Sequence, residues 1–223
     1  MKKLLLVLMI LVGISSYAQE ISIDLENFTE VEVSNGLKVN LIKAEENKAI
    51  ITGNSRDKVE IDLKDGVLKV QSSLNHIWNE DNTLVNVYFK QLLKVEARQN
   101  SEIEICGMIK QPIIEFKSAE GADIFANIEV ENFIGRSSTG GNLEVIGSAK
   151  DQIIDLKAAG DFKGENLIGD TVDISLSAGG KANVFGKKYV KANVTAGGTI
   201  YVYGHPEKLD KKTTFGGTIK KIN

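Results

Sequence analysis

A short Gly-rich step recurs through the second half of this chain and constrains the fold more than any other feature. The seven steps are Gln99-Asn100-Ser101, Ala119-Glu120-Gly121, Thr139-Gly140-Gly141, Ala158-Ala159-Gly160, Ala178-Gly179-Gly180, Ala196-Gly197-Gly198 and Phe215-Gly216-Gly217. Their last members are separated by 20, 20, 19, 20, 18 and 19 residues. Such a constant interval indicates a repeat architecture in which each repeat is one structural unit.

Each step lies between two short segments in which apolar and polar residues alternate, such as residues 172–177 and 200–204. Strict alternation places the apolar side chains on one face of a β-strand and the polar ones on the other. The glycine step then marks a corner, where the chain turns tightly or adopts a positive φ.

The length of the repeat selects among repeat folds. About 20 extended residues span about 65 Å at ~3.3 Å per residue, which suffices for one coil of a narrow solenoid. A propeller blade needs about 40–45 residues, and the consensus of leucine-rich repeats is absent. We therefore predict an all-β, parallel β-helix (solenoid) with coils of about 20 residues, in which stacked coils share one apolar core.

The first half of the chain is less regular. Residues 28–41 are expected to form two strands around Asn35-Gly36, and residues 58–63 and 67–70 two more around Asp65-Gly66, as a hairpin or a coil corner. Polar residues 75–82 are expected to form a loop. We predict a single β-helix domain over residues 19–223, with irregular coils or a cap at 19–94 and regular coils at 95–223. A separate small domain is the alternative, although no linker marks it.

The N-terminus has the three-part layout of a secretory signal peptide. Lys2 and Lys3 precede an apolar run over residues 4–14, and Ser16 and Ala18 are small. We predict a signal peptide at residues 1–18 and an exported protein in the periplasm, on the outer-membrane surface or secreted. A membrane anchor is the alternative, but the apolar run is shorter than the ~20 residues of a bilayer span. The rest of the chain contains no apolar stretch of that length, so no transmembrane segment is expected in the mature protein.

Charge and cysteine content narrow the function further. Removing Lys2 and Lys3 changes the formal charge from −3 to −5 (−3 − 2), and an acidic chain is a poor partner for nucleic acid. The one cysteine, Cys106, cannot form an internal disulfide. Because it lies in an alternating apolar segment, we expect it to be a small core residue.

The order of the motifs resembles a known family. The sequence FTEVEV at residues 28–33 is followed by DGVLKV at 65–70, the Gly-rich coils, YVYGHP at 201–206 and GGTI at 216–219. This order is similar to the auto-transporter adhesin, head GIN domain family of Bacteroidetes, over nearly all of the mature chain. The family's Ser-Gly-x-Gly steps are mostly Ala-Gly-Gly here. The resemblance implies a right-handed parallel β-helix outside the cytoplasm and brings no catalytic residues with it.

The sequence contains no recognisable reaction centre. His76 and His205 have no partner at metal-ligand spacing, and the motifs of phosphate loops, dinucleotide sites and nucleophile elbows are absent. We therefore expect no catalytic residues, no metal and no cofactor. Asp161 follows its glycine step, whereas Asn142 and Lys181 follow the neighbouring steps, so the acidic residues do not line up as a polysaccharide-cleaving centre requires. The candidate carboxylates are Glu120, Asp123, Glu144, Asp155, Asp161 and Asp173.

Five residues are candidates for ligand contact. His76 and Trp78 share the polar loop, and Tyr201, Tyr203 and His205 lie near the last coils, where they could form an aromatic platform for sugar or protein. Alternatively, Trp78 covers the end of the core and one tyrosine packs.

The sequence thus favours an exported, non-catalytic surface or envelope binding module, adhesin-like, with an unknown partner such as a cell-surface glycan or protein. The alternative is a β-helix polysaccharide-active enzyme, a lyase or glycosidase. A cleft with convergent carboxylates and Arg or Lys would favour the enzyme, and a flat flank with exposed aromatic residues would favour binding. We also expect Lys220 and Lys221 to protect the last strand from pairing with another chain.

Overall fold

The computed structural model describes residues 20–73 and 82–222. The predicted signal peptide at 1–18, most of the predicted loop at 75–82, and with it His76 and Trp78, lie outside the described residues.

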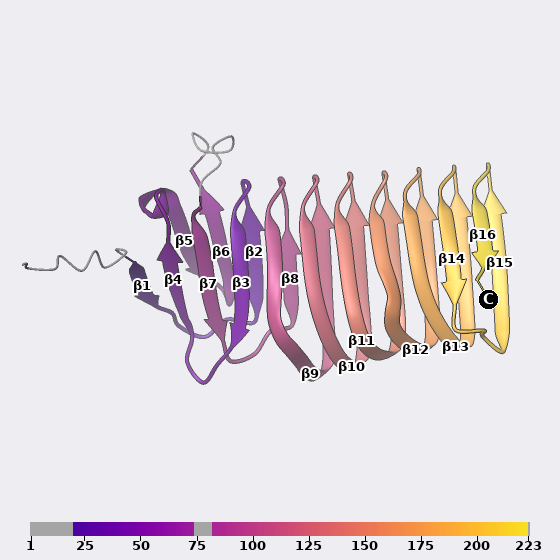
Figure 1. Ribbon diagram of the computed structural model, residues 1–223, viewed down its shortest axis with the longest axis horizontal. Coiled ribbons are helices and arrows are strands. Elements are labelled where there is room, and N and C mark those ends of the chain that lie inside the picture. The colour runs from indigo at the N-terminus through magenta and orange to yellow at the C-terminus, as the bar shows by residue number, and fades with distance from the viewer. Residues whose placement is uncertain (1–19, 74–81, 223) are drawn as a thin grey trace, which may run out of the picture.

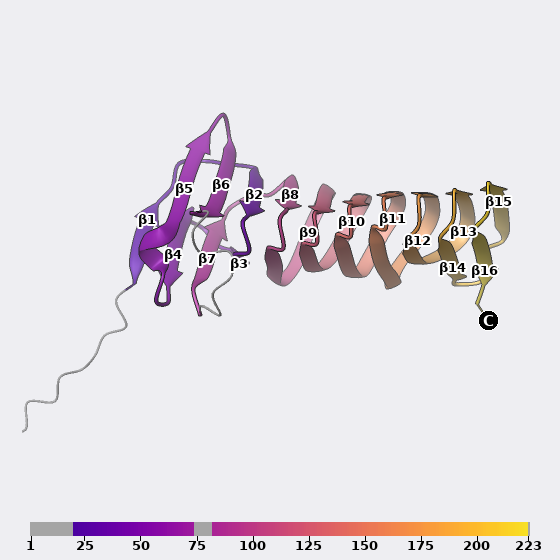
Figure 2. The same cartoon turned by 90° about the horizontal axis from the view of Figure 1, so that it is seen from above.

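The chain forms a flattened solenoid with two faces of strands (Figures 1 and 2). Five long strands each run along one face, bend, and return along the other, and each pairs in parallel with the next. They are β9 (Glu102–Ala119), β10 (Asp123–Ser138), β11 (Asn142–Lys157), β12 (Asp161–Ser177) and β13 (Lys181–Thr195). The predicted all-β parallel β-helix is confirmed.

Two faces can be followed through the strand pairing. The first face has the order β1-β4-β7-β3, then the first halves of β9–β13, then β14 (Thr199–Tyr203) and β16 (Thr218–Lys221). The second face has the order β5-β6-β2-β8, then the second halves of β9–β13, then β15 (Lys208–Thr214). Both faces belong to one continuous hydrogen-bonded network of sixteen strands.

The strands before β9 are shorter and form less regular coils than the long strands. The parallel ones are β2 (Glu30–Ser34), β3 (Lys38–Lys43), β6 (Val67–Ser72), β7 (Leu84–Phe89) and β8 (Lys94–Ala97). Antiparallel pairing appears at the start of the stack, in β1 (Ile21–Asp24), β4 (Lys48–Thr52) and β5 (Val59–Lys64). The strands expected around Asn35-Gly36 and Asp65-Gly66 are therefore present, and β5–β6 is a hairpin rather than a coil corner. The division at residue 94 stays a prediction.

The tight turns explain the glycine step. Ala178 and Gly179 both have positive φ, at 58° and 85°, and Ala158 and Ala159 hold the same conformation at 47° and 61°. Two successive left-handed residues form a tight turn, which the N–H of Gly160 closes by donating to the carbonyl of Lys157 at 3.0 Å. In the coil that contains Glu120, the step is one residue later than predicted, because Glu120 and Gly121 have positive φ whereas Ala119 still belongs to β9.

Where the third residue of a turn is glycine, it faces the preceding coil at close range. A Cβ on Gly160 would lie 2.5 Å from the carbonyl oxygen of Ser137, and one on Gly180 would overlap the carbonyl oxygen of Gly160. The stacking distance therefore requires glycine at both positions, and at Gly180 a φ of 98° adds a second reason.

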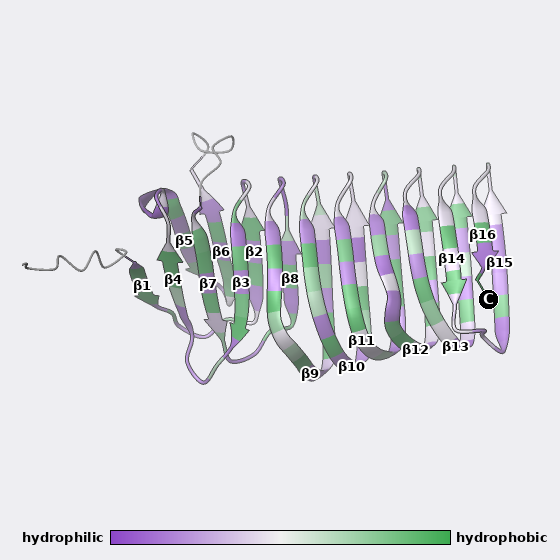
Figure 3. Cartoon of the chain, in the orientation of Figure 1, coloured by the Kyte–Doolittle hydropathy of each residue, from purple (hydrophilic) through white to green (hydrophobic). Residues whose placement is uncertain are grey.

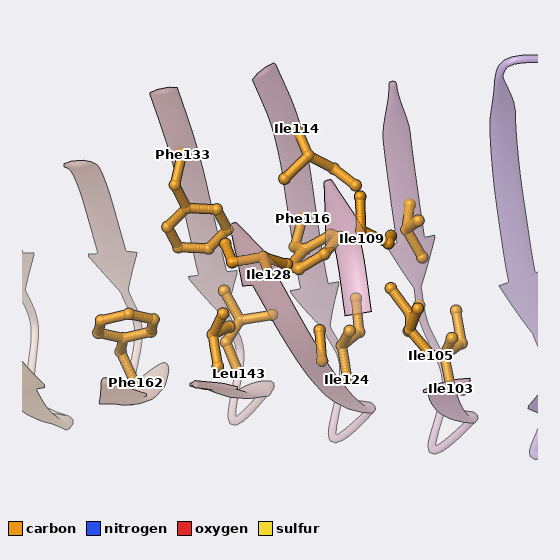
Figure 4. Packing of buried hydrophobic residues seen from close by; sticks show 14 of the residues in the cluster. Ile103, Ile105, Ile109, Ile114, Phe116, Ile124, Ile128, Phe133, Leu143 and Phe162 are labelled. Atoms are coloured by element: carbon orange, nitrogen blue, oxygen red, sulfur yellow. The ribbon is translucent and has the colours of Figure 1, made fainter. Parts of the chain in front are cut away.

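The core lies between the two faces, and buried apolar residues alternate with more exposed ones along the strands. Figure 3 shows the matching alternation of hydrophobic and hydrophilic residues along each strand. Phe116 of β9 and Phe133 of β10 lie in neighbouring coils with ring centroids 5.5 Å apart, and Phe133 lies 6.1 Å from Phe162 in the first half of β12 (Figure 4). Buried Ser118 and Ser137 donate hydrogen bonds to the backbone carbonyls of Ala122 and Gly141, which satisfies polar groups beside the turns.

The expectation that Cys106 fills the core is wrong. Ile103 and Ile105 are buried, but Cys106 is exposed, since it follows Glu104 by two residues and shares its outward side. Partial burial, together with the charge of Glu104, raises the pKa of the thiol.

Candidate functional site

The outward faces of the solenoid are covered by ion pairs that join neighbouring coils. Arg136, for example, donates to Glu115 at 2.9 Å, and Lys191 to Asp173 at 2.9 Å. Further pairs of this kind are Lys38–Glu102, Lys69–Glu32, Lys94–Glu30, Arg98–Glu120, Lys110–Glu129 and Lys163–Glu144. Each exposed pair contributes little stability, and each carboxylate in a pair already has a cation beside it.

The six candidate carboxylates all have partners, which are cations for four of them, and they are spread over both faces. Glu120 accepts from Arg98 at 2.7 Å and Glu144 from Lys163 at 3.1 Å. Asp161 accepts the backbone N–H of Lys181 at 2.7 Å. Asp123 accepts a hydrogen bond from Asn142 and Asp173 one from Lys191, and Asp155 forms an ion pair with Lys157. The structure does not bring them together.

One carboxylate that the sequence analysis missed is the most enclosed. Glu96 is 5 % exposed and lies 2.8 Å from Lys117, 3.8 Å from Lys94 and 3.8 Å from Arg98. The alternation of the sequence places Lys94 and Glu96 on one side of β8 and Arg98, just after the strand, on the same side, which is a signal for such a cluster. Only the pairing of β8 with β9 adds Lys117.

The structure brings two of the predicted aromatic residues together. Tyr201 and Tyr203 both point outward from β14, and Tyr203 lies in register with Phe185 of β13. Lysines lie against Tyr201 on both sides: the Nζ of Lys181 is 5.2 Å and that of Lys220 is 5.7 Å from the ring centroid. We call Phe185, Tyr201 and Tyr203 the aromatic platform.

His205 follows Gly204 at the bend beyond β14, is exposed and has a φ of 50°. Phe185 was not predicted, because its neighbour in the next coil becomes known only when the register is fixed.

A shallow hollow of about 550 Å³ lies where the long strands bend. It is lined by Gln111, Pro112, Glu129, Val130, Glu131, Ser148, Lys150, Ile168, Gly169, Asp170 and Lys187. Each of its three carboxylates lies close to a lysine amine. The distances are 2.8 Å for Glu129–Lys110, 3.7 Å for Glu131–Lys150 and 2.8 Å for Asp170–Lys188.

The hydrogen bond from Lys188 lowers the pKa of Asp170. A general acid in glycoside cleavage needs the opposite shift.

Residues 20–73 and 82–222 contain no group of three or more His, Cys, Asp or Glu side chains arranged to hold a metal ion. In the same residues, no helix has the length and apolar character needed to cross a membrane.

Residues 27–206 match the family model described as "Putative auto-transporter adhesin, head GIN domain". The chain belongs to this family. Among curated proteins, none matches this head GIN domain chain.

Solved structures share its fold at low sequence identity. A "putative adhesin" from Bacteroides fragilis has a TM-score of 0.82 at 16% identity and covers 92% of this chain and 97% of its own. A "putative adhesin" from Parabacteroides distasonis has a TM-score of 0.73 at 16% identity, covering 92% and 96%. A "Putative lipid binding protein" from the same species has a TM-score of 0.71 at 15% identity, covering 92% and 96%. At these identities the likeness shows the head GIN domain fold alone.

Proposed function

We propose that this chain is an exported, non-catalytic binding module of the cell envelope or cell surface. The observation on which the proposal rests is the pairing of outward carboxylates with cations across coils, which leaves two long, flat flanks. Solenoids use such extended surfaces to bind polymers and large partners. The adhesin description of the family and of its structural relatives supports the same class of function.

The aromatic platform is the proposed contact surface for a cell-surface glycan or protein. Aromatic rings supply a large contact area with few rotatable bonds, and sugars and proteins both use it. Lys181 and Lys220 beside Tyr201 add positive charge, which favours an acidic partner. His205 is a further candidate nearby, and His76 and Trp78 remain candidates on the sequence alone.

A screen of purified cell-surface glycans and envelope proteins tests this proposal. The double variant Tyr201→Ala/Tyr203→Ala should weaken binding by at least about tenfold, as expected when central aromatic anchors are removed. Tyr88→Ala is a matched control, because Tyr88 also lies on the first face with a lysine, Lys48, 4.8 Å from its ring centroid. Equal binding by both variants would contradict the proposal.

The hollow at the strand bends favours one other function, a polysaccharide-active enzyme, since it combines carboxylates and lysines. Incubation of the protein with acidic and neutral polysaccharides, followed by measurement of chain length, decides between the two. The binding proposal predicts unchanged polymers. Shortening that disappears in Glu129→Gln or Asp170→Asn would establish the enzyme instead.

A further inference from the structure

The charge of this chain is divided along the axis of the solenoid. Residues 181–223 contain nine lysines and two acidic residues, a net charge of +7 (9 − 2). Residues 19–180 contain sixteen Lys and Arg and twenty-eight Asp and Glu, a net charge of −12 (16 − 28). Because the coils follow one another along the axis, the positive charge gathers at the C-terminal end (Figure 1).

Most lysines of this end lack the ion pairs seen elsewhere. Lys188, Lys191 and Lys208 lie within 4 Å of a carboxylate. Within residues 20–73 and 82–222, no carboxylate lies that close to the other six, which are Lys181, Lys187, Lys211, Lys212, Lys220 and Lys221. The middle coils neutralise their cations, whereas the last coils leave theirs available.

The last coil also turns lysines toward the open end of the core. Lys211 occupies the register position held by Ala192 one coil earlier, and Lys221 the position held by Val202. Ala192 and Val202 are buried, whereas Lys211 and Lys221 are exposed. The last layer of the stack is therefore partly basic: Leu209 and Ile219 still pack against the core, and Lys211 and Lys221 take the next inward positions. We call Lys211, Lys212 and Lys221 the basic end.

A large apolar side chain stands beside these lysines in the same coil. Phe215 is 88% exposed and has a φ of 55° in the turn that joins β15 and β16. A bulky residue in the left-handed region is strained, and earlier coils use Ala178 and Ala196 at this position. Protection of the edge strand explains the lysines but does not explain a strained, exposed phenylalanine.

We propose that the basic end docks end-on against an anionic membrane surface, with Phe215 entering the boundary between headgroups and acyl chains. Lysines are attracted to anionic lipid only within about one Debye length, ~8 Å at physiological salt. The acidic remainder of the chain is repelled by the same surface, so only the end-on orientation brings the lysines close and keeps the carboxylates away. A buried aromatic anchor adds an apolar contribution to such interfacial binding.

This inference goes beyond the proposed glycan or protein binding and uses a different surface. It rests on the proposed export in one respect: an exported protein would meet a membrane of the cell envelope. The basic end leaves out Lys220, which contacts the aromatic platform. Failure of one proposal can therefore be distinguished from failure of the other.

Sedimentation with lipid vesicles tests the inference, with the same N-terminus on every variant. The parent should bind vesicles of equal parts phosphatidylcholine and phosphatidylglycerol, bind phosphatidylcholine alone more weakly, and lose the difference at high salt. Lys211→Glu/Lys212→Glu/Lys221→Glu should weaken binding to the anionic vesicles by at least about tenfold. The control Lys43→Glu/Lys64→Glu/Lys90→Glu makes the same change in net charge at exposed positions in the acidic part and should stay within about twofold of the parent.

Phe215→Asn separates anchoring from folding. Asparagine tolerates the left-handed conformation, so the melting midpoint should stay the same or rise while binding to anionic vesicles weakens roughly threefold. Equal binding by the two triple variants would overturn the inference. So would binding of the parent to soluble polygalacturonate with no preference for anionic over neutral vesicles.

Discussion

Lys117 of β9 donates a hydrogen bond to Glu96 of β8 at 2.8 Å, across two neighbouring coils of the second face. Lys94 and Arg98 approach the same carboxylate. Glu96 thus combines low exposure with three cationic neighbours. This charged cluster, in addition to the backbone hydrogen bonds, holds β8 and β9 in register.

Glu96→Ala should lower the free energy of unfolding by about 1–3 kcal/mol, because three cations would lose their shared partner. Glu32→Ala is the control: Glu32 is far more exposed and pairs with Lys69 at 3.5 Å, so its loss should cost less than about 0.5 kcal/mol. Chemical denaturation of both variants measures the difference. Similar losses would show that the cluster at Glu96 is an ordinary surface pair.

The glycines at the third turn position should not accept β-branched residues. Gly180→Val should lower the free energy of unfolding by about 1–3 kcal/mol, because φ is 98° and the Cβ overlaps the preceding coil. Gly160→Val and Gly198→Val should also destabilise. Gly179→Asn is the control, since no atom lies within 4 Å of its added Cβ and asparagine tolerates its φ of 85°. Unchanged melting midpoints in all three valine variants would contradict the stacking argument.

Tyr189 and Asp210 should titrate as a linked pair. The Tyr189 hydroxyl donates to Asp210 at 2.8 Å, which raises the pKa of Tyr189 above its ordinary value and, with Lys208, lowers the pKa of Asp210 below its ordinary value. The contribution of Asp210 to stability is thus present above its unfolded pKa and lost as the pH falls through its folded pKa. That of Tyr189 is present below its unfolded pKa and lost as the pH rises through its folded pKa.

Asp210→Asn should therefore let Tyr189 ionise at a lower pH than in the parent. Ultraviolet absorbance of tyrosinate measures this, and Tyr189→Phe identifies the signal. If the tyrosinate curve of Asp210→Asn overlays that of the parent, the hydrogen bond has no influence on the titration.

The repeat and its alternation predicted the coils correctly, because both depend on neighbouring residues in the chain. The errors arise where the side of the strand on which a residue lies, or its neighbour in the next coil, has to be known. The expectation for Cys106 is wrong because Cys106 lies on the same side of the strand as Glu104. Phe185 is missed because its neighbour Tyr203 is eighteen residues away in the chain. Register shifts, such as that between β9 and β10 at Phe125, change lateral neighbours in a way that no periodicity reveals.

The exposed edge of β16 should depend on its lysines for solubility. Lys220→Val/Lys221→Val should keep the monomer fold and promote end-to-end association, because an unpaired strand without charge is a template for another chain. Light scattering at matched concentrations compares it with the parent and with Lys43→Val/Lys64→Val. A double variant as monodisperse as the parent would mean that these lysines do not protect the edge.

The central claim is that the chain binds a cell-surface glycan or protein through its flank and does not cleave it. The most direct measurement combines both properties: binding of the protein to purified cell-surface polysaccharides and envelope proteins, with chain length or integrity recorded after incubation. The account predicts saturable binding to at least one component, lost in Tyr201→Ala/Tyr203→Ala, kept in Tyr88→Ala, with the bound material intact. Cleavage of the bound material, or binding that both tyrosine variants retain in full, would contradict it.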